Sequence, residues 1–163
     1  MGDVMDKDEA HYPPTFQAVI DWTEEMEGNW DFVASDNHIN FYFHHEGCAY
    51  SGTAIEENGE SLTLTLVYEL PQPIDELTLR RRISDVDIDQ KYGALILNHE
   101  LAVIVWRDSI SSTEPESFDS EVIDQTVAFG ISAFNDLRFA IADLLGVTAS
   151  DMKLANSPAA GTA

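Results

Sequence analysis

The residue types best suited to metal chemistry, His44, Glu46 and Cys48, lie within one short segment of the sequence. Imidazole, carboxylate and thiolate groups are all zinc ligands, and on a single β-strand these three side chains would point to the same face. A structural zinc site usually draws on two separated pairs of ligands, and only His38 or His99 could complete the set here. Because a complete ligand set cannot be read from this spacing, we interpret the segment as a polar strand end beside a turn and predict no metal site.

A second candidate is the run Arg80, Arg81 and Arg82, which holds three of the 8 basic residues of the chain. One hypothesis is that this run binds an anion or a partner protein. Successive helical residues point about 100° apart, so the three side chains cannot form one flat patch. Acidic residues such as Glu76 lie at helical spacing from the arginines. We therefore favour the interpretation that ion pairs within the helix neutralise the run.

No arrangement of residues in the chain indicates catalysis. The triplet Asp85, Asp87 and Asp89 resembles the start of a calcium loop, but the glycine and glutamate that such a loop requires later are replaced by Gln90 and Ile96. The sequence also lacks a Gly-x-Ser-x-Gly nucleophile elbow, a glycine-rich phosphate loop and a His-Glu-x-x-His zinc motif. We therefore predict a protein without enzymatic activity and without a cofactor.

The charge balance limits the classes of partner. The chain of 163 residues has 30 acidic residues against 8 basic ones, and its formal net charge is −22. Such a surface repels nucleic acids and anionic membranes, and it favours basic proteins, basic peptide segments and cations. Solubility alone, or adaptation to a salt-rich environment, would explain the same excess of acidic residues. The charge predicts a protein partner and argues against nucleic acid and membrane partners.

Cellular location is predicted from the cysteine content and from targeting signals. Cys48 is the only cysteine, so no intramolecular disulfide can form, as is usual in a reducing compartment. The first residues lack the basic and apolar regions of a signal peptide. No apolar stretch approaches the roughly 18 residues that span a bilayer. We expect a cytoplasmic protein.

One domain is predicted over residues 13–147, between a flexible acidic tail over residues 1–12 and a flexible C-terminal tail over residues 148–163. A domain has about 150 residues, and hydrophobic residues make up 44% of the chain. That composition supports a core without disulfides or metals. The two tails are polar and lack periodic apolar residues, which is typical of flexible termini.

The apolar pattern predicts an α+β fold. Helical spacing leads up to Gly28, and four strands with a period of two follow over residues 30–70, with a turn at Asn58 and Gly59. A second helix, over residues 74–89, precedes a β-hairpin. The second strand of that hairpin, residues 101–106, is apolar enough to be buried on both faces.

A polar loop over residues 109–117 precedes the longest periodic segment, which predicts a long C-terminal helix ending near Gly146. We expect Gly130 of this helix to pack closely on the sheet, and Trp22 and Trp106 to lie in the core. The predicted order is therefore helix, four-stranded antiparallel meander, helix, β-hairpin and long C-terminal helix, with strands and helices segregated.

A wider pattern joins residues 62–70, the proline-rich start of the middle helix, residues 93–97, residues 103–110 and the final helix. This pattern resembles the YbjN-like family, whose fold is shared with type III secretion chaperones. The resemblance covers most of the chain, residues 13–147. It implies a link to the regulation of sensory transduction, with no established enzymatic activity or cofactor. It also implies a small acidic homodimer that holds extended segments of partner proteins.

Two functions remain open from the sequence. The first is a dimeric, YbjN-like binding module that regulates or escorts a partner protein, through an apolar groove or an exposed sheet edge. The second is an enzyme, metal-binding protein or small-ligand binder whose site is assembled from separated residues. A deep pocket with convergent polar groups would favour the second function.

Overall fold

The structure, a computed structural model, describes residues 12–57, 61–111 and 118–148. Within these ranges the elements follow in the order α1 (Pro14–Glu25), β1 (Asn29–Val33), β2 (His38–His45), β3 (Cys48–Glu57), β4 (Ser61–Glu69), α2 (Glu76–Asp87), β5 (Ala94–Asn98), β6 (Val103–Ser111) and α3 (Ser120–Leu145). The predicted α+β class and the predicted order of elements are confirmed.

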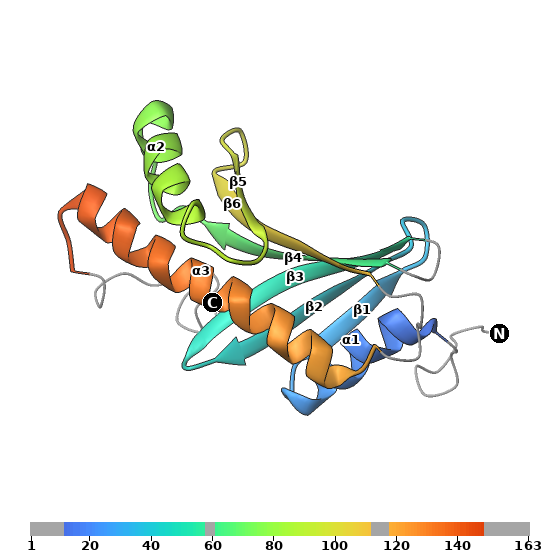
Figure 1. Ribbon diagram of the computed structural model, residues 1–163. Helices are drawn as coiled ribbons and strands as arrows, with labels where there is room; N and C mark the ends of the chain where they lie inside the picture. Colours follow the sequence, from blue (N-terminus) through green and yellow to red (C-terminus); the bar gives the residue numbers. More distant parts are fainter. Residues whose placement is uncertain (1–11, 58–60, 112–117, 149–163) are drawn as a thin grey trace.

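The strands form one six-stranded antiparallel sheet with the order β1-β2-β3-β4-β6-β5 (Figure 1). Strands β1 to β4 form the predicted meander. The hairpin joins this meander through its second strand, because β6 pairs with β4 and places Trp106 opposite Leu66. As a result β5 contacts only β6 in the sheet and forms one of its two edges.

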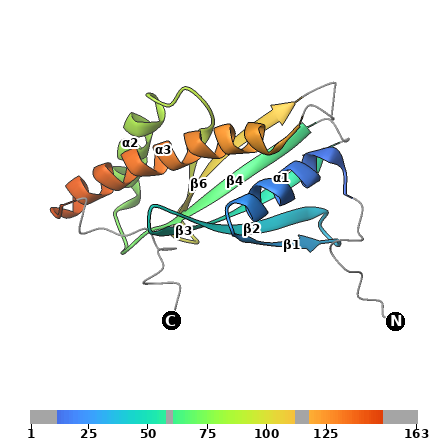
Figure 2. The same cartoon turned by 90° about the horizontal axis from the view of Figure 1, so that it is seen from below.

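Helices α1 and α3 lie side by side across one face of the sheet, as both views show (Figures 1 and 2). The core lies between these helices and the inward residues of the strands. These inward residues alternate along each strand with less buried ones, as the period of two predicted. The buried inward side chains are Trp30, Ile39, Phe41, Phe43, Tyr50, Ala54, Leu62, Leu64, Leu66, Tyr68, Leu95, Ile104 and Trp106.

Helix α1 supplies one half of the helical layer. Pro14 occupies its first turn, where the missing backbone N–H costs nothing because that group has no partner within the helix. Phe16, Val19 and Trp22 are buried against the sheet, and the indole N–H of Trp22 donates to the carboxylate of Asp124 in α3 at 2.9 Å. This bond satisfies the one polar group of a buried tryptophan and joins the two helices.

Helix α3, of 26 residues, supplies the other half. Its N-terminus is capped by the Asp119 carboxylate, which accepts from the Val122 backbone N–H at 3.0 Å, and its C-terminus ends at Gly146 in the left-handed conformation. Gly130 allows the close approach that the sequence predicted, since a Cβ there would lie 2.7 Å from a Trp106 ring carbon. Neither α3 nor another helix of the described ranges has the length and apolar character needed to cross a membrane.

Two details of the predicted hairpin were wrong. Strand β6 continues to Ser111, into the segment predicted as loop, because its pairing with β4 extends as far as Ser61 opposite Ser111. The strand is also covered on one face only. Ile104 and Trp106 are buried, whereas Val105 on the other face is half-buried. A run of valine and isoleucine therefore marks a β-branched strand here, and not burial on both faces.

The tails predicted from the sequence, and the predicted turn at Asn58, lie outside the described residues except for the tail ends Tyr12 and Thr148. The ring of Tyr12 makes edge contacts with Trp30 and Phe32, at centroid distances of 5.6 and 5.4 Å. Such contacts extend the aromatic core to the residue before the proline pair of α1.

Candidate functional site

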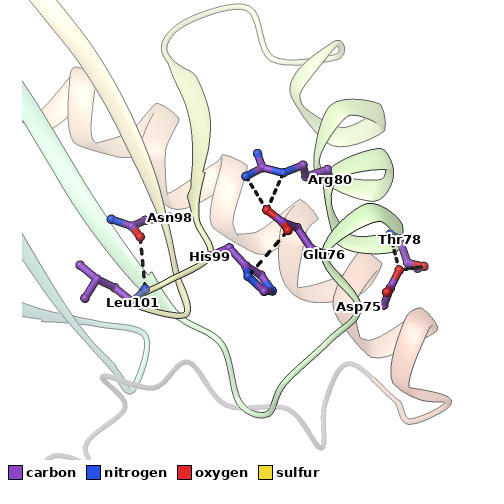
Figure 3. Close-up of polar contacts among 7 residues, drawn as sticks. All are labelled: Asp75, Glu76, Thr78, Arg80, Asn98, His99 and Leu101. Carbon is purple, nitrogen blue, oxygen red and sulfur yellow. Dashed lines mark hydrogen bonds and ion pairs between the residues drawn. The ribbon is translucent and has the colours of Figure 1, made fainter.

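Helix α2 begins at a capped N-terminus. The carboxylate of Asp75, the residue before the helix, accepts hydrogen bonds from the backbone N–H of Thr78 at 3.0 Å and from its hydroxyl at 2.9 Å (Figure 3). Both hydrogen bonds stabilise the ionised carboxylate and hold the pKa of Asp75 below its usual value, and the bond from the backbone N–H has the larger effect. The cap fixes the start of α2 and therefore fixes which helical residues face β5.

Two kinds of contact hold α2 in place. Leu79 and Ile83 are buried against the core. On the outer side, Arg82 Nη1 lies 2.8 Å from Asp143 Oδ2 near the end of α3. The helix is therefore fixed beside β5 and the C-terminal half of α3, as Figure 1 shows.

The free edge of β5 faces α2. Backbone groups of successive residues in an antiparallel strand point to opposite sides. The N–H of Leu95 points away from β6, because it donates to the Asp87 carboxylate of α2 at 2.9 Å. By alternation, the N–H of Leu97 also points to the free edge. Asp87 therefore satisfies the first outward donor of β5 and leaves the next one facing the space beside α2.

A groove of about 310 Å³ occupies that space between α2 and β5. The helical residues that line it lie at positions i, i+3, i+4 and i+7, so they share one face of α2. The lining consists of Arg80, Ile83, Ser84 and Asp87 from α2, and Leu95, Ile96 and Leu97 from β5. The volume lies at the lower end of the roughly 300–1,000 Å³ found for ligand pockets.

Polar contacts join the start of α2 to the hairpin beside this groove (Figure 3). Glu76 Oε1 accepts from Arg80 Nε at 3.2 Å and from Arg80 Nη2 at 2.9 Å. The other oxygen of Glu76 lies 3.9 Å from Nδ1 of His99, in the β5–β6 turn. That turn is further held by Asn98, whose side-chain oxygen accepts from the Leu101 backbone N–H at 3.2 Å. Of these residues Arg80 lines the groove, and Glu76 joins it to the hairpin turn.

The arginine run has three different roles. Arg80 forms the predicted ion pair within the helix, with Glu76 four residues earlier. Arg82 instead pairs with Asp143 of α3, which spacing along the sequence could not show. Arg81 is exposed and takes part in no ion pair with another described residue. Of the three predicted candidates, only Arg80 lines the groove.

The structure does not bring His44, Glu46 and Cys48 together on one face. The favoured interpretation, a polar strand end beside a turn, agrees with the structure, because Glu46 and Gly47 form a tight turn with positive φ between β2 and β3. The turn pairs His45 with Cys48, so His44 and Cys48 lie on opposite faces of the sheet. Among the described residues, no group of three His, Cys, Asp or Glu side chains is arranged to hold a metal ion.

The sequence analysis missed two buried polar atoms, the Tyr68 hydroxyl oxygen and the Nε of Arg138. Tyr68 is 1% exposed, and its hydroxyl, like the Nε of Arg138 in α3, lacks a hydrogen-bond partner among the described residues. Burial raises the pKa of Tyr68 and of Tyr50 to about 12, and the positive charge of Arg138 offsets a part of both shifts. The period of two in the strands could have placed both tyrosines inside, but Arg138 gives no comparable signal.

No known protein family and no curated protein matches this sequence. Among solved structures, the fold is similar to the crystal structure of YbjN from E. coli, a candidate transcription regulator, with a TM-score of 0.53 and 11% identity. The match covers 84% of this chain and 96% of that one. The structure of the HopA1–SchA chaperone–effector complex matches with a TM-score of 0.49 and 14% identity, over 73% of this chain and 88% of that one. The predicted YbjN-like fold is therefore confirmed, as a likeness of fold.

The α2–β5 groove is suited to binding. Its two charged side chains are already engaged, Arg80 with Glu76 and Asp87 with the Leu95 backbone, so they do not converge on a common point. Its other lining side chains are apolar except for Ser84, and they border the edge of β5 that pairs with no other described strand. An unpaired strand edge is a template for pairing with another chain.

Proposed function

We propose that this protein is a non-enzymatic protein-binding module that holds an extended segment of a partner protein along β5. The observation that carries the proposal is the unpaired edge of β5 beside the groove of about 310 Å³ under α2. An extended segment that adds to a sheet edge gains backbone hydrogen bonds, and alternate side chains enter pockets beside the edge. The groove and the edge together supply both parts of this binding mode.

The lining of the groove specifies the chemistry of the segment. An apolar side chain fits between Ile83 of α2 and the leucines of β5. A basic side chain is favoured next to it, because the Asp87 carboxylate carries a negative charge that no described cation neutralises. The net charge of −22 attracts the same kind of segment over a longer range. We therefore expect an extended segment with alternating apolar and basic residues.

The YbjN-like fold supports a regulatory or chaperone-like role for this binding, in a homodimer that acts in the cytoplasm. The dimer is tested by light scattering at micromolar concentration. A mass of one chain, 18.1 kDa, at all concentrations would refute the dimer and leave the binding of a segment untouched.

The groove is tested by peptide display against the immobilised full-length protein. The change Ser84→Trp places a large ring in the groove, and the neighbouring change Asp85→Trp places the same ring about 100° away around α2. Peptides selected on the wild type should bind the Ser84→Trp variant at least about tenfold more weakly, whereas Asp85→Trp should bind them normally. Equal binding by all three proteins would refute the groove as the site.

The alternative from the sequence, a site for a small ligand, metal or substrate, predicts convergent polar groups. The buried Tyr68 hydroxyl and Arg138 Nε are the observation that favours it. A thermal-shift panel of metabolites and metal ions tests it, and a stabilisation that Arg138→Met abolishes would support this function over the first.

A further inference from the structure

The outward face of the sheet, opposite α1 and α3, carries the alternate residues of all six strands. Strand pairing aligns these residues in rows across the sheet. One complete row runs through Asp31, Asn40, Thr53, Thr65, Arg107 and Ala94. Large apolar side chains are exposed on the same face, including Tyr42 at 50%, Ile55 at 42% and Ile96 at 40%. No described helix covers this face, as Figures 1 and 2 show.

The charge of the outward face differs from that of the rest of the chain. Asp31, Glu57 and Glu69 are its only acidic residues among the described strand positions, and Arg107 is its only cationic one. The three acidic residues lie at strand ends or on the edge strand β1. The centre of the face is neutral in a chain whose net charge is −22.

We propose that the outward face is the surface through which two copies of this chain associate. This inference rests on the dimer in the proposed function and names its interface. Two molecules of charge −22 repel each other, so they can associate only where few acidic groups meet. Two sheets packed face to face lie about 10 Å apart, and the acidic helices lie on the outside of both. The two helical layers are then about 30 Å apart, several times the Debye length of about 8 Å at physiological salt.

The outward face is large enough for a stable interface with a second copy of the chain. Six strands of 5 to 10 residues present about half of their side chains outward, which is comparable to the roughly 20–30 residues that each partner contributes to a stable interface. Depletion of charged residues at the centre, with exposed aromatic and β-branched side chains, is also typical of such interfaces.

The arrangement of charge fits a twofold axis along the strands, between β3 and β4 in the middle of the sheet order. This axis places β6 of one copy opposite β2 of the other. Because Arg107 and Asp31 share a row, Arg107 of one copy then lies over Asn40 and next to Asp31 of the second copy. The dimer therefore contains two contacts between Arg107 of one copy and Asp31 of the other, one on each side of the axis. Neither residue has an ion pair with another described residue of its own chain.

Sedimentation equilibrium of full-length variants tests the interface. Arg107→Glu and Asp31→Arg should each raise the dimer dissociation constant about 10- to 100-fold, and the double variant should restore it to within about threefold of wild type. Thr65→Arg, at the centre of the face, should leave a folded monomer. The control Lys91→Glu changes the net charge as Arg107→Glu does, but lies outside the sheet, and should dimerise like wild type. Circular dichroism confirms that each variant is folded.

The possible results separate this inference from the dimer itself. A dimer that resists Arg107→Glu and Thr65→Arg would overturn the interface and leave the dimer standing on another surface. A monomeric wild type would overturn both. A monomer that dimerises only when residues 149–163 are removed would show that the chain's own C-terminal segment, and not a second copy, occupies the face.

Discussion

The packing of α3 on the sheet predicts that adding one methyl group at Gly130 destabilises the protein. Gly130 lies at the middle of α3, where a Cβ would be 2.7 Å from Leu66 Cδ1 and 2.7 Å from Trp106 Cε3. The leucine methyl is the end of a flexible side chain and can move. The indole is more restricted, because Gly93 also lies against it, and a Cβ there would be 2.4 Å from Trp106 Nε1. Trp106 therefore packs closely on two glycines.

The expected magnitude is the difference between two opposing effects. Replacing glycine by alanine within a helix stabilises it by about 1 kcal/mol. Overpacking a filled core by one methyl group costs about 1–3 kcal/mol, and the fixed indole favours the upper half of this range. The net loss for Gly130→Ala is about 1–2 kcal/mol, which lowers the Tm of a protein of this size by roughly 2–8 °C.

Chemical and thermal unfolding of Gly130→Ala, followed by tryptophan fluorescence, measure this loss. Ser132→Ala is the matched control, since Ser132 is exposed on the same helix and the change should raise stability slightly. A Gly130→Ala variant that is as stable as Ser132→Ala would refute the reasoning, because α3 would then not lie against Trp106 at the distance described.

Three further predictions follow from contacts described above. Gly93→Ala should cost about 3 kcal/mol in the free energy of unfolding, because φ is +76° there and the added Cβ meets Trp106; a denaturant titration measures it. Asp75→Ala should lower the Tm at pH 7. Calorimetry should show that the difference in Tm from wild type shrinks as the pH falls below about 4, because the Asp75 carboxylate, whose pKa is lowered in the folded protein, stabilises the fold only while it is ionised. The pKa values of Tyr50 and Tyr68 are raised to about 12, so their neutral hydroxyls stabilise the folded state below pH 10, and this stabilisation is lost as the pH rises toward 12. The ultraviolet absorbance of tyrosinate should therefore show both side chains ionising together with unfolding.

The contacts that the sequence predicted correctly are local. The Glu76–Arg80 pair was predictable because residues four apart on a helix are neighbours. Burial of the strand residues was equally predictable, because alternation needs no knowledge of partners. The pair between Arg82 and Asp143 joins residues 61 positions apart, and no periodicity reports such a contact.

The candidate site depends on contacts between residues that are far apart in the sequence. Both hairpin strands are apolar, so the sequence could not show that β6 would join β4 and leave β5 as an edge. Without that order, neither the groove nor the free donor at Leu97 can be predicted. The faces of His44 and Cys48 could be assigned only once the exact position of the turn was known, since a two-residue turn reverses the chain and exchanges the faces of the residues beyond it.

The position of α3 in the chain has a consequence for synthesis. This helix follows all six strands in the sequence, yet it contacts β4, β6, α1 and α2 and covers much of the inner face of the sheet. A ribosome adds roughly 5–20 residues per second, so the inner face of the sheet remains exposed to solvent for seconds after the meander has emerged. A nascent chain of this protein therefore displays an apolar sheet that its own finished form conceals. Chaperones that bind apolar segments should associate with it until α3 leaves the exit tunnel, and slower translation across residues 118–148 should lengthen that association.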